Sequence, residues 1–480
     1  MMPSDTCWTD DSLGALREEF AAVYGGRTVL VTGADGFMGS HLTEALVALD
    51  ANVHAFVRAT SSGALNNIGQ FRNRLKVHFA DLTDKTSIDY LMRELKETAT
   101  DKPYIFHLGA QAHVGESWHR PYETVMANTI GTLNLLQSIV DYGLEIEKFD
   151  TAGTSEEYGN VNEDVSHHHD FDKEGSLILH ERSPVNPKSI YATSKVAADF
   201  LTMNYFDGYG LPGVVTRMFN NYGPRQNPRY ITGTIITQAL ERDVIELGAL
   251  TPLRDFCFCS DGVRGHLTVA SKGKSGDVYV YGQGDNISMA DWAALILRIG
   301  EEQGYWGKRE ITSVAKRFRP GSSDVVALRV GYEKLHAETG WKPLVSWEEG
   351  VAQCIDEIVN VLEPHRQPHE AVRQTDPLAF SRFYSRVGHG HGVSNQGFDG
   401  AQVLGERPEP NAVHQRLAGS HSAHDLEGQH GSIARRLSCG QVVLGKGRES
   451  RIVHGRDFRL RLQKLGNGQR IGGLAVHAHR

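Results

Sequence analysis

The sequence predicts an α/β protein built on a doubly wound parallel sheet and followed by a tail of low order. Short apolar runs alternate with helical patterns over residues 27–151, as in parallel strands joined by crossover helices. A glycine-rich turn follows the first apolar run, where such sheets bind ligands. Near residue 365 the composition changes, which marks the end of this pattern.

The composition is that of a globular protein with two or three domains. The 480 residues include 50 Lys and Arg against 58 Asp and Glu, a formal net charge of −8. No apolar run reaches the ~20 residues that span a bilayer, so no membrane partner is expected. The N-terminus (MMPSDTCWTDD) has no signal pattern, and we expect a cytoplasmic location. The acidic balance gives no support for nucleic-acid binding. Five cysteines are too few and too scattered for a disulfide framework.

The tail after about residue 365 is basic. Residues 366–480 hold 15 Arg and 2 Lys against 9 Asp and Glu, so the tail carries +8 and the rest −16. This ratio of Arg to Lys suggests translation of a shifted reading frame of GC-rich DNA. The alternative is a basic extension that binds an acidic partner. Low order is expected over 363–480 in both cases.

Five strands and three helices account for the alternating pattern. The strands are expected at Arg27–Thr32, Asn52–Val57, Leu75–Phe79, Tyr104–Leu108 and from Lys148 to Thr151. Helices are expected from the glycine turn to about residue 49, over 84–97 and over 122–142. The motifs described below follow these strands, at the edge of the sheet where ligands bind.

The turn after the first strand (residues 32–39, TGADGFMG) predicts a dinucleotide site in a Rossmann-type sheet. Gly33, Gly36 and Gly39 let the turn tighten, the backbone approach a pyrophosphate and the helix pack on the strand. The start of the helix then offers N–H groups to the phosphates. A plain structural turn is the alternative, but the strand–turn–helix context favours the cofactor. The same turn contributes Asp35, Phe37 and Met38.

The ends of the next strands bear on the choice of cofactor. An acidic residue that binds the ribose of NAD is missing from the end of the second strand, where Arg58 stands instead. Its charge complements the 2′-phosphate of NADP, so NADP is favoured over NAD, although a solvated arginine is the alternative. Asp81 and Leu82 follow the third strand, where they would meet the adenine ring. A simple loop aspartate is equally compatible with this position.

Tyr191 and Lys195 are the predicted reacting pair. At positions i and i+4 of a helix, their side chains face the same way. A nearby ammonium stabilises a phenolate, so the tyrosine could take a proton from a substrate alcohol as hydride leaves. The spacing alone is common by chance, and it gains weight from the strands and the glycine turn that precede it.

At this point the chain resembles the extended short-chain dehydrogenase/reductase family over about residues 27–360. The resemblance rests on the glycine turn, Asp81-Leu82, residues 107–111 (HLGAQ), Tyr191 with Lys195, residues 217–225 (RMFNNYGPR) and 254–256 (RDF). It implies a Rossmann domain over 27–220 after an N-terminal extension (1–26), and a smaller nucleotide-sugar-binding domain interleaved with it over 221–362. It also implies a homodimer or homotetramer.

The resemblance also implies further contacts of the cofactor and the substrate. Leu108, Ala110 and Gln111 would contact the cofactor. Substrate contacts are expected from His113, Asn220, Arg225, Arg254 and Arg319. Guanidinium groups match the oxygens of a diphosphate, although each arginine could instead be an ordinary surface residue. Trp118 could line the sugar pocket beside His113, or both could serve packing.

Thr154-Ser155-Glu156 at the tip of the fifth strand resembles the reactive triplet of GDP-mannose 4,6-dehydratases. The implied reaction begins with transient oxidation at C4, which acidifies the C5 hydrogen. Glu156 would then remove that hydrogen, water would leave from C6 and hydride would return to C6. Thr154 would bind the C4 oxygen, and Ser155 would orient the leaving hydroxyl. A surface carboxylate is the plainer interpretation of Glu156.

Three other functions are compatible with these motifs. A UDP-sugar 5,6-dehydratase would form an exocyclic glycal with the same residues, and a 4-epimerase would eliminate no water. A non-catalytic NADP-binding regulatory protein would tolerate the loss of Tyr191.

Two further clusters are predicted to be structural, and no metal site is expected. The run 167–170 (HHHD) would lie in a solvated loop, because adjacent histidines rarely converge on one metal. Cys257 and Cys259 would share one face of a strand in the core. Both cysteines lack partner residues nearby in the sequence, which argues against a redox or zinc role.

Overall fold

The computed structural model describes residues 6–160, 169–171, 173, 175, 177–318, 325–362, 442–444 and 451–453. The chain divides into two compact units, Met1–Asn395 and Gln396–Arg480. In the second, β16 (Val442–Leu444) pairs antiparallel with β17 (Arg451–Val453). The rest of the tail lies outside the described residues, and so do the predicted positions Arg319, His167 and His168.

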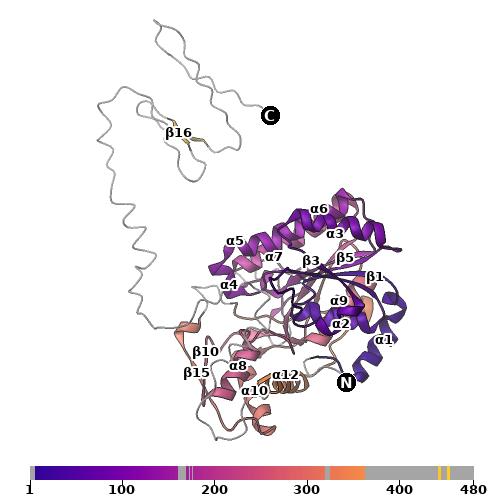
Figure 1. The fold of residues 1–480 in the computed structure, drawn as a ribbon. Helices are drawn as coiled ribbons and strands as arrows, with labels where there is room; N and C mark the ends of the chain where they lie inside the picture. The colour runs from indigo at the N-terminus through magenta and orange to yellow at the C-terminus, as the bar shows by residue number, and fades with distance from the viewer. Residues whose placement is uncertain are drawn as a thin grey trace. The chain divides into compact units, whose positions relative to one another are not determined.

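A seven-stranded parallel sheet forms the centre of the first unit (Figure 1), in the order β13-β8-β5-β4-β1-β2-β3. Its strands are β1 (Thr28–Thr32), β2 (Asn52–Val57), β3 (Leu75–Phe79), β4 (Tyr104–His107), β5 (Lys148–Thr154), β8 (Gly213–Met218) and β13 (Val278–Tyr281). The predicted fold class is confirmed. The strand order changes direction between β1 and β4, and in sheets of this kind ligands bind at such a switch point, at the carboxyl ends of the strands.

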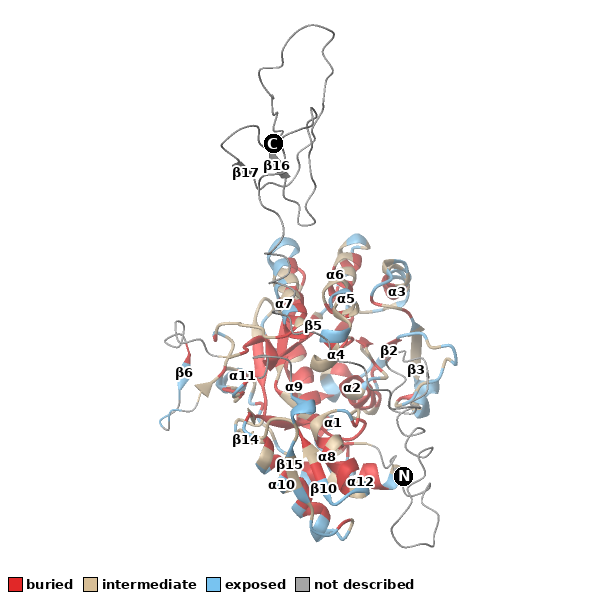
Figure 2. Ribbon diagram, turned by 90° about the vertical axis from the view of Figure 1, so that its left-hand side faces the viewer, coloured by how far each residue is buried: buried red, intermediate tan, exposed pale blue. Residues whose placement is uncertain are grey.

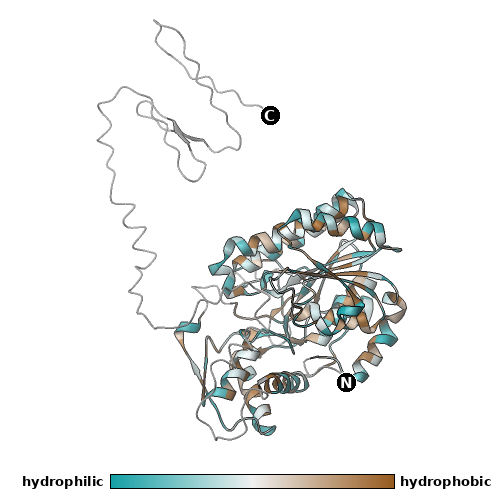
Figure 3. Cartoon of the chain, viewed as in Figure 1, coloured by the Kyte–Doolittle hydropathy of each residue, from teal (hydrophilic) through white to brown (hydrophobic). Residues whose placement is uncertain are grey.

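Helices cover both faces of the sheet, because successive side chains of a strand point to opposite faces. Val29 and Val31 of β1 pack with α1 (Asp10–Tyr24), α2 (Phe37–Ala48) and α9 (Cys259–Lys272). Leu30 between them packs with α3 (Lys85–Thr98) and α6 (Gly131–Asp141) on the other face, which α7 (Ile190–Tyr209) also covers. Buried residues lie in the central strands and in the helices packed between the sheet and the rest of the unit, such as α9 (Figure 2). The outer helices alternate between hydrophilic and hydrophobic stretches, as amphipathic helices do (Figure 3).

Residues 6–26, predicted only as part of an N-terminal extension, contribute to the core. Leu16, Phe20 and Tyr24 of α1 are buried. The hydroxyl of Tyr24 donates a 2.6 Å hydrogen bond to Leu267 O of α9. Helix α1 thereby covers the sheet face that carries the glycine turn.

The helix predicted over 122–142 consists of three segments. After α4 (Val114–His119), α5 (Pro121–Val125) runs into a π-helical turn, η2 (Met126–Ile130), and then into α6. Such turns widen a helix by one residue and often occur at functional sites. Here the turn contains the buried Asn128.

The C-terminal part of the first unit lies below the carboxyl edge of the sheet in Figure 1. Its helices are α8 (Ile231–Glu241), α10 (Met289–Glu302), α11 (Glu333–Thr339) and α12 (Trp347–Leu362). Its strand pairs are β9 (Asn220–Tyr222) with β12 (Phe256–Phe258), β10 (Val244–Leu247) with β15 (Glu310–Ser313), and β11 (Leu253–Arg254) with β14 (Ile287–Ser288). A hairpin pairs β6 (Asp170–Phe171) with β7 (Leu177–Ile178).

Two expectations about domains and location stay predictions. The division into domains at residue 220 is not tested by the two compact units. Among the described residues, no helix has both the length and the apolarity to cross a membrane. The cytoplasmic location also stays a prediction.

Candidate active site

The glycine turn between β1 and α2 has the shape of a phosphate cradle. Gly33 has φ +67°, and a Cβ atom there would lie 2.9 Å from Gly109 Cα. A Cβ atom at Gly39 would lie 2.1 Å from Gly33 O, so only glycine fits. Gly36 is the N-cap of α2 and gives it no side-chain cap. The first N–H groups of α2 therefore lack a side-chain cap, as a bound pyrophosphate requires. The residues present fit a dinucleotide.

Asp35, Phe37 and Met38, the other predicted residues of this turn, contact the protein around it. The carboxylate of Asp35 accepts hydrogen bonds from the backbone N–H groups of Asn67 (2.8 Å) and Ile68 (3.1 Å) and from a third, at residue 66. Burial raises the pKa of Asp35, and these bonds oppose the rise. Asp35 thus fixes the loop after β2. Met38 is buried beneath the turn, and Phe37 is half-buried at the start of α2.

The residues expected around the adenosine part of the cofactor lie at the ends of β2 and β3. Arg58 is exposed, and its Nη1 is 3.9 Å from Glu123 Oε1 of α5. Asp81 accepts hydrogen bonds from the backbone and the hydroxyl of Thr83, at 2.8 and 2.7 Å, so it shapes its own turn. Leu82 is buried, and a Cβ atom at Gly131 would lie 2.8 Å from Leu82 Cβ.

A buried hydrogen-bond network joins β1, β4 and α6 behind the turn. His107 Nδ1 lies 2.8 Å from Thr32 Oγ1, and His107 Nε2 lies 2.9 Å from Thr132 Oγ1. The Gly109 N–H donates to Thr32 Oγ1 at 2.9 Å. Burial, aided by the charge of Lys195, lowers the pKa of His107 to about 3. A neutral histidine therefore holds the end of β4 against the glycine turn.

Gln111 connects this region to the reacting helix. Its backbone N–H donates to Asn128 Oδ1 at 2.7 Å, and Asn128 Nδ2 donates to Ser194 Oγ of α7 at 2.9 Å. Leu108 and Ala110, beside Gln111, are half-buried after β4. Sequence reasoning missed Asn128, because the widened turn that points it inward is not visible in a helical pattern.

The reactive triplet lies in a buried turn at the tip of β5. Thr154 is the last residue of β5 and caps η3 (Ser155–Glu157), accepting a hydrogen bond from the Glu156 backbone N–H at 3.3 Å. Glu156 is 6% exposed. The Tyr191 hydroxyl of α7 forms a side-chain hydrogen bond with Thr154, and Glu156 acts electrostatically on it. The structure therefore brings together the predicted phenol, hydroxyl and carboxylate.

Tyr191 and Lys195 lie on one face of α7, and both are buried. Burial raises the pKa of Tyr191, the nearby Tyr230 raises it further, and the hydrogen bond with Thr154 opposes the rise. Burial lowers the pKa of Lys195, whose Nζ donates to Ala152 O at 2.8 Å. The ammonium group is thus held against β5, two residues before its last residue, Thr154.

Beneath the triplet lies an ion cluster that sequence reasoning missed. Arg217 Nε is 2.9 Å from both Glu157 Oε2 and Asp199 Oδ2. Glu157 Oε1 also accepts a hydrogen bond from the Thr154 backbone N–H at 2.8 Å. Burial, aided by Asp199, raises the pKa of Glu157 well above its ordinary value. The helical spacing could have indicated Asp199, because it lies four residues after Lys195 and therefore on the same face of the helix as Tyr191 and Lys195.

Two of the arginines expected to bind the substrate diphosphate are turned into the protein. Arg225 has φ +63°, and its guanidinium lies 2.9 Å from Glu44 Oε2 of α2 with both side chains buried. Arg254 is 5% exposed and donates to the backbone oxygens of Leu253 (2.9 Å) and Val325 (2.7 Å). The charge of Arg225 already has a buried partner inside the protein, and its contact with the substrate stays a prediction. Asn220 of β9 is half-buried.

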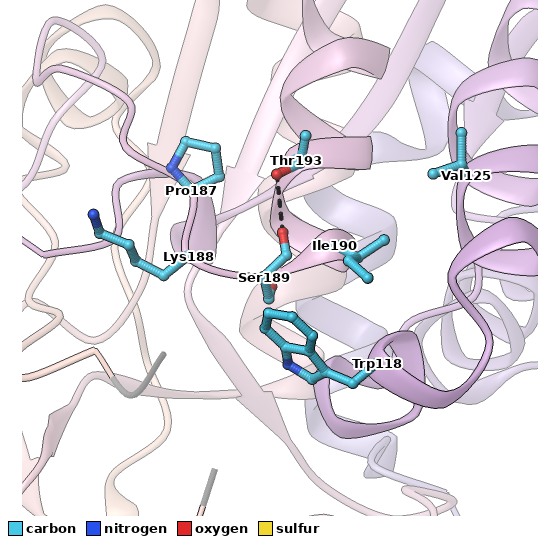
Figure 4. Close-up of a pocket in the computed structure, with 7 residues that line it drawn as sticks. All are labelled: Trp118, Val125, Pro187, Lys188, Ser189, Ile190 and Thr193. Carbon is cyan, nitrogen blue, oxygen red and sulfur yellow. Dashed lines mark hydrogen bonds between the residues drawn. The ribbon is translucent and has the colours of Figure 1, made fainter. Parts of the chain in front are cut away.

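Two hollows lie beside the reacting helix. The smaller, of about 60 Å³, is lined by Gln111 and His113, whose ring is 5.4 Å from that of Tyr230. The larger, of about 300 Å³, is drawn in Figure 4 and is lined by Trp118, Val125, Pro187, Lys188, Ser189, Ile190 and Thr193. Trp118 lies beside Ser189 and Ile190 at the start of α7 and does not line the smaller hollow. The smaller hollow contains Gln111 and His113, which were predicted to bind ligand, and the larger contains Trp118.

The two structural predictions for histidines and cysteines need correction. His169 is 7% exposed, so it does not lie in a solvated loop. Cys259 begins helix α9 instead of continuing the strand of Cys257. Cys7 and His41, distant in the sequence, lie beside Cys259. The statement that Cys259 lacks partners is therefore wrong, because folding brings the N-terminal segment and α2 to it.

The sheet order, the glycine turn and the Tyr191–Lys195 pair define the class of extended short-chain dehydrogenases/reductases. A family model described as GDP-mannose 4,6 dehydratase matches residues 30–354. This match covers more than half of the chain, and the chain belongs to that family.

Curated relatives and solved structures agree with this assignment. A dTDP-D-glucose 4,6-dehydratase of Mus musculus is 30% identical over 71% of this chain and 92% of its own length. A GDP-mannose 4,6-dehydratase of Vibrio cholerae is 28% identical over 71% of this chain and 95% of its own. The dTDP-glucose 4,6-dehydratase DesIV of Streptomyces venezuelae, solved with NAD, matches with TM-score 0.58 and 27% identity over 69% of this chain and 97% of its own. RMD of Pseudomonas aeruginosa, solved with NADPH, matches with TM-score 0.55 and 25% identity over 69% and 98%.

Proposed function

We propose that this nucleotide-sugar 4,6-dehydratase converts its substrate to a 4-keto-6-deoxy sugar, with GDP-mannose as the first substrate to test. The observation that carries the proposal is the position of Glu156. It lies in the buried turn that Thr154 caps, where it acts electrostatically on Tyr191. An epimerase needs the tyrosine but no carboxylate at this point, whereas elimination needs a base for C5.

Each residue of this site has a separate role in the proposed reaction. The bound nicotinamide supplies reversible storage of hydride. Tyr191 takes the proton of the C4 hydroxyl, and Lys195 supplies the positive charge that favours its phenolate. Thr154 holds the C4 oxygen. Glu156 removes the C5 proton and returns a proton to the hydroxyl that leaves C6 as water, which Ser155 orients.

A panel of GDP-, dTDP-, UDP- and CDP-sugars tests this function. The product of the expected reaction is lighter than its substrate by one water, as mass spectrometry would show. NMR would then show a 4-keto group and a C6 methyl group. An unchanged mass would favour the epimerase, and an exocyclic double bond the 5,6-dehydratase. Either result would overturn the proposal.

NADP is proposed as the preferred cofactor because Arg58 stands where the second strand ends, exposed and close to α5. A guanidinium group there complements a 2′-phosphate. Replacing Arg58 by Ala should weaken binding of NADP roughly 10- to 150-fold, as the loss of a charge-assisted hydrogen bond worth ~1.5–3 kcal/mol predicts. Binding of NAD should stay unchanged. Equal losses for both cofactors would contradict this preference.

A second copy of the chain is proposed to cover an exposed apolar surface on α5, η2 and α7. Tyr122 is 86% exposed, Phe200 53%, Met126 41% and Val125 40%. The three elements that carry these side chains contact one another, and large exposed apolar side chains that lie close together are typical of protein interfaces. Light scattering should show a dimer or tetramer, and Phe200→Asp should shift it toward the monomer. A wild-type monomer at micromolar concentration would overturn this part.

A further inference from the structure

A cluster of metal-ligating side chains lies under α2, outside the site described above. The sulfurs of Cys7 and Cys259 and one ring nitrogen of His41 all lie within 4.8 Å of one another. All three residues are buried. Four bonds to a tetrahedral zinc ion would place such atoms about 3.5–3.8 Å apart, so small side-chain adjustments would close the site.

The hydrogen bonding of His41 is a second, independent observation that points to a metal ion. It is fully buried on α2, and its Nε2 lies 2.8 Å from Pro224 O. A carbonyl oxygen only accepts, so Nε2 is the nitrogen that carries the hydrogen. Nδ1 then keeps a lone pair, and it has no hydrogen-bond partner although it is buried. Histidines that bind a metal usually donate a hydrogen bond from one ring nitrogen, often to a backbone carbonyl, and bind the metal with the lone pair of the other.

The chain holds Cys7 in place through both of its neighbours. The Thr6 hydroxyl donates to Glu44 Oε2 at 2.9 Å, and the Trp8 indole N–H donates to His41 O at 3.1 Å. Both acceptors belong to α2. Cys259 is held from the other side, since a Cβ atom at Gly223 would lie 2.2 Å from its sulfur.

We infer that Cys7, His41 and Cys259 form a structural site for a thiophilic divalent cation, and zinc is the ion that this donor set favours. Two thiolates and a neutral imidazole would neutralise its charge. The ion would fasten the N-terminal segment to α2 and to the start of α9.

Two neighbours of the cluster are consistent with this inference. Cys354 of α12 is 2% exposed, and its thiol interacts electrostatically with those of Cys7 and Cys259, so it is placed to supply a fourth ligand. Arg225 would repel a cation, but its charge is paired with Glu44 at 2.9 Å. A disulfide between Cys7 and Cys259 would leave the lone pair of His41 without a partner, so the metal explains more of the geometry.

Metal analysis of the full chain tests the site. Protein purified with a thiol reductant, given zinc and passed through a desalting column should retain about one zinc per chain. Cys7→Ser and Cys259→Ser should lose it. Cys257→Ser is the matched control, since Cys257 is equally buried two residues away but lies outside the cluster, and it should keep its zinc.

Cobalt provides a readout that needs no variant. The wild-type chain loaded with Co²⁺ should show a sulfur-to-cobalt charge-transfer band and the intense visible bands of a tetrahedral site. A chelator should lower the melting temperature of the zinc-loaded wild type and leave that of Cys7→Ser unchanged.

Three results would overturn the inference. They are a wild type that retains no zinc and shows no tetrahedral cobalt bands, a Cys257→Ser variant that loses as much zinc as Cys7→Ser, and a metal-free Cys7–Cys259 disulfide in protein purified with reductant. None of these measurements uses dehydratase activity, so the site can fail without the proposed function failing.

Discussion

The reactive turn and the ion cluster beneath it contain the same kinds of residue in different surroundings. Glu156 and Glu157 are neighbours in the chain. Both carboxyl groups act electrostatically on Tyr191, but Glu157 is fully buried and pairs with Arg217 at 2.9 Å. Glu156 is the proposed base, whereas Glu157 holds the turn through Arg217 and the Thr154 N–H. Residue type alone therefore does not separate reacting groups from supporting ones, but the partner of each group does.

Tyr191→Phe should cause the largest effect, because it removes the proton acceptor of the reactive turn and leaves the ion cluster intact. General acid–base groups contribute roughly 10²–10⁴-fold to rate, and kcat should fall within this range. The melting temperature should change little. Tyr90→Phe is the control, since Tyr90 is 61% exposed on α3 and should keep full activity. Full turnover by Tyr191→Phe would support the non-catalytic alternative.

Arg217→Met should destabilise the fold, because it leaves two buried carboxylates without their cation. Breaking a buried ion pair costs about 3–5 kcal/mol, and here the pair that is broken is the one with Asp199, because the raised pKa of Glu157 favours its neutral form. Urea unfolding should show this loss, and activity should fall through disorder of the turn. Arg298→Met breaks an exposed pair with Glu302 and should cost less than ~1 kcal/mol. Similar losses in both variants would mean that the buried cluster does not support the turn.

The regions differ in how far the sequence predicts them. The bounds of β2 and β3 and the glycine turn follow from local patterns, because apolar runs and glycines act within a few residues. The Tyr191–Lys195 pair follows from helix spacing. The structure places these elements at one edge of the sheet, although the roles of the individual residues stay predictions.

Long-range partners were not predictable in the same way. Arg225 belongs to a motif that suggested substrate binding, yet Glu44, 181 positions earlier, neutralises it in the interior. Cys259 acquires Cys7 and His41 as neighbours only through folding. In each case the deciding contact joins distant segments, and a pattern confined to one segment cannot reveal it.

Glu156→Gln tests the reactive turn more finely than the loss of Tyr191. The amide keeps the shape of the side chain but cannot accept the C5 proton, so dehydration should slow by roughly 100-fold or more. Oxidation at C4 should continue, and reduced cofactor should accumulate after substrate is added, as its absorbance would show. Normal dehydration by this variant would rule out Glu156 as the base.

Glu157→Gln should have the smallest effect, although the change is chemically identical. In the unfolded chain Glu157 loses its proton near the ordinary pKa of 4.5. In the folded protein its pKa is raised well above that value, so the proton stays bound to higher pH. Stability from this group is therefore present at low pH and is lost as pH rises through the folded pKa. An amide resembles the protonated acid and can still accept from the Thr154 N–H, so the free energy of unfolding should change by less than ~1 kcal/mol near pH 5.

The difference between wild type and Glu157→Gln across pH isolates this group. The buried Asp255, whose pKa is raised to about 7, contributes a slope of the same sign to both proteins. It therefore cancels in the comparison. From pH 5 to 8, the wild type should lose up to ~1.4 kcal/mol per pH unit more than the variant. Parallel curves would show that Glu157 is ionised in the folded protein, and the cluster would then hold two negative charges against one guanidinium.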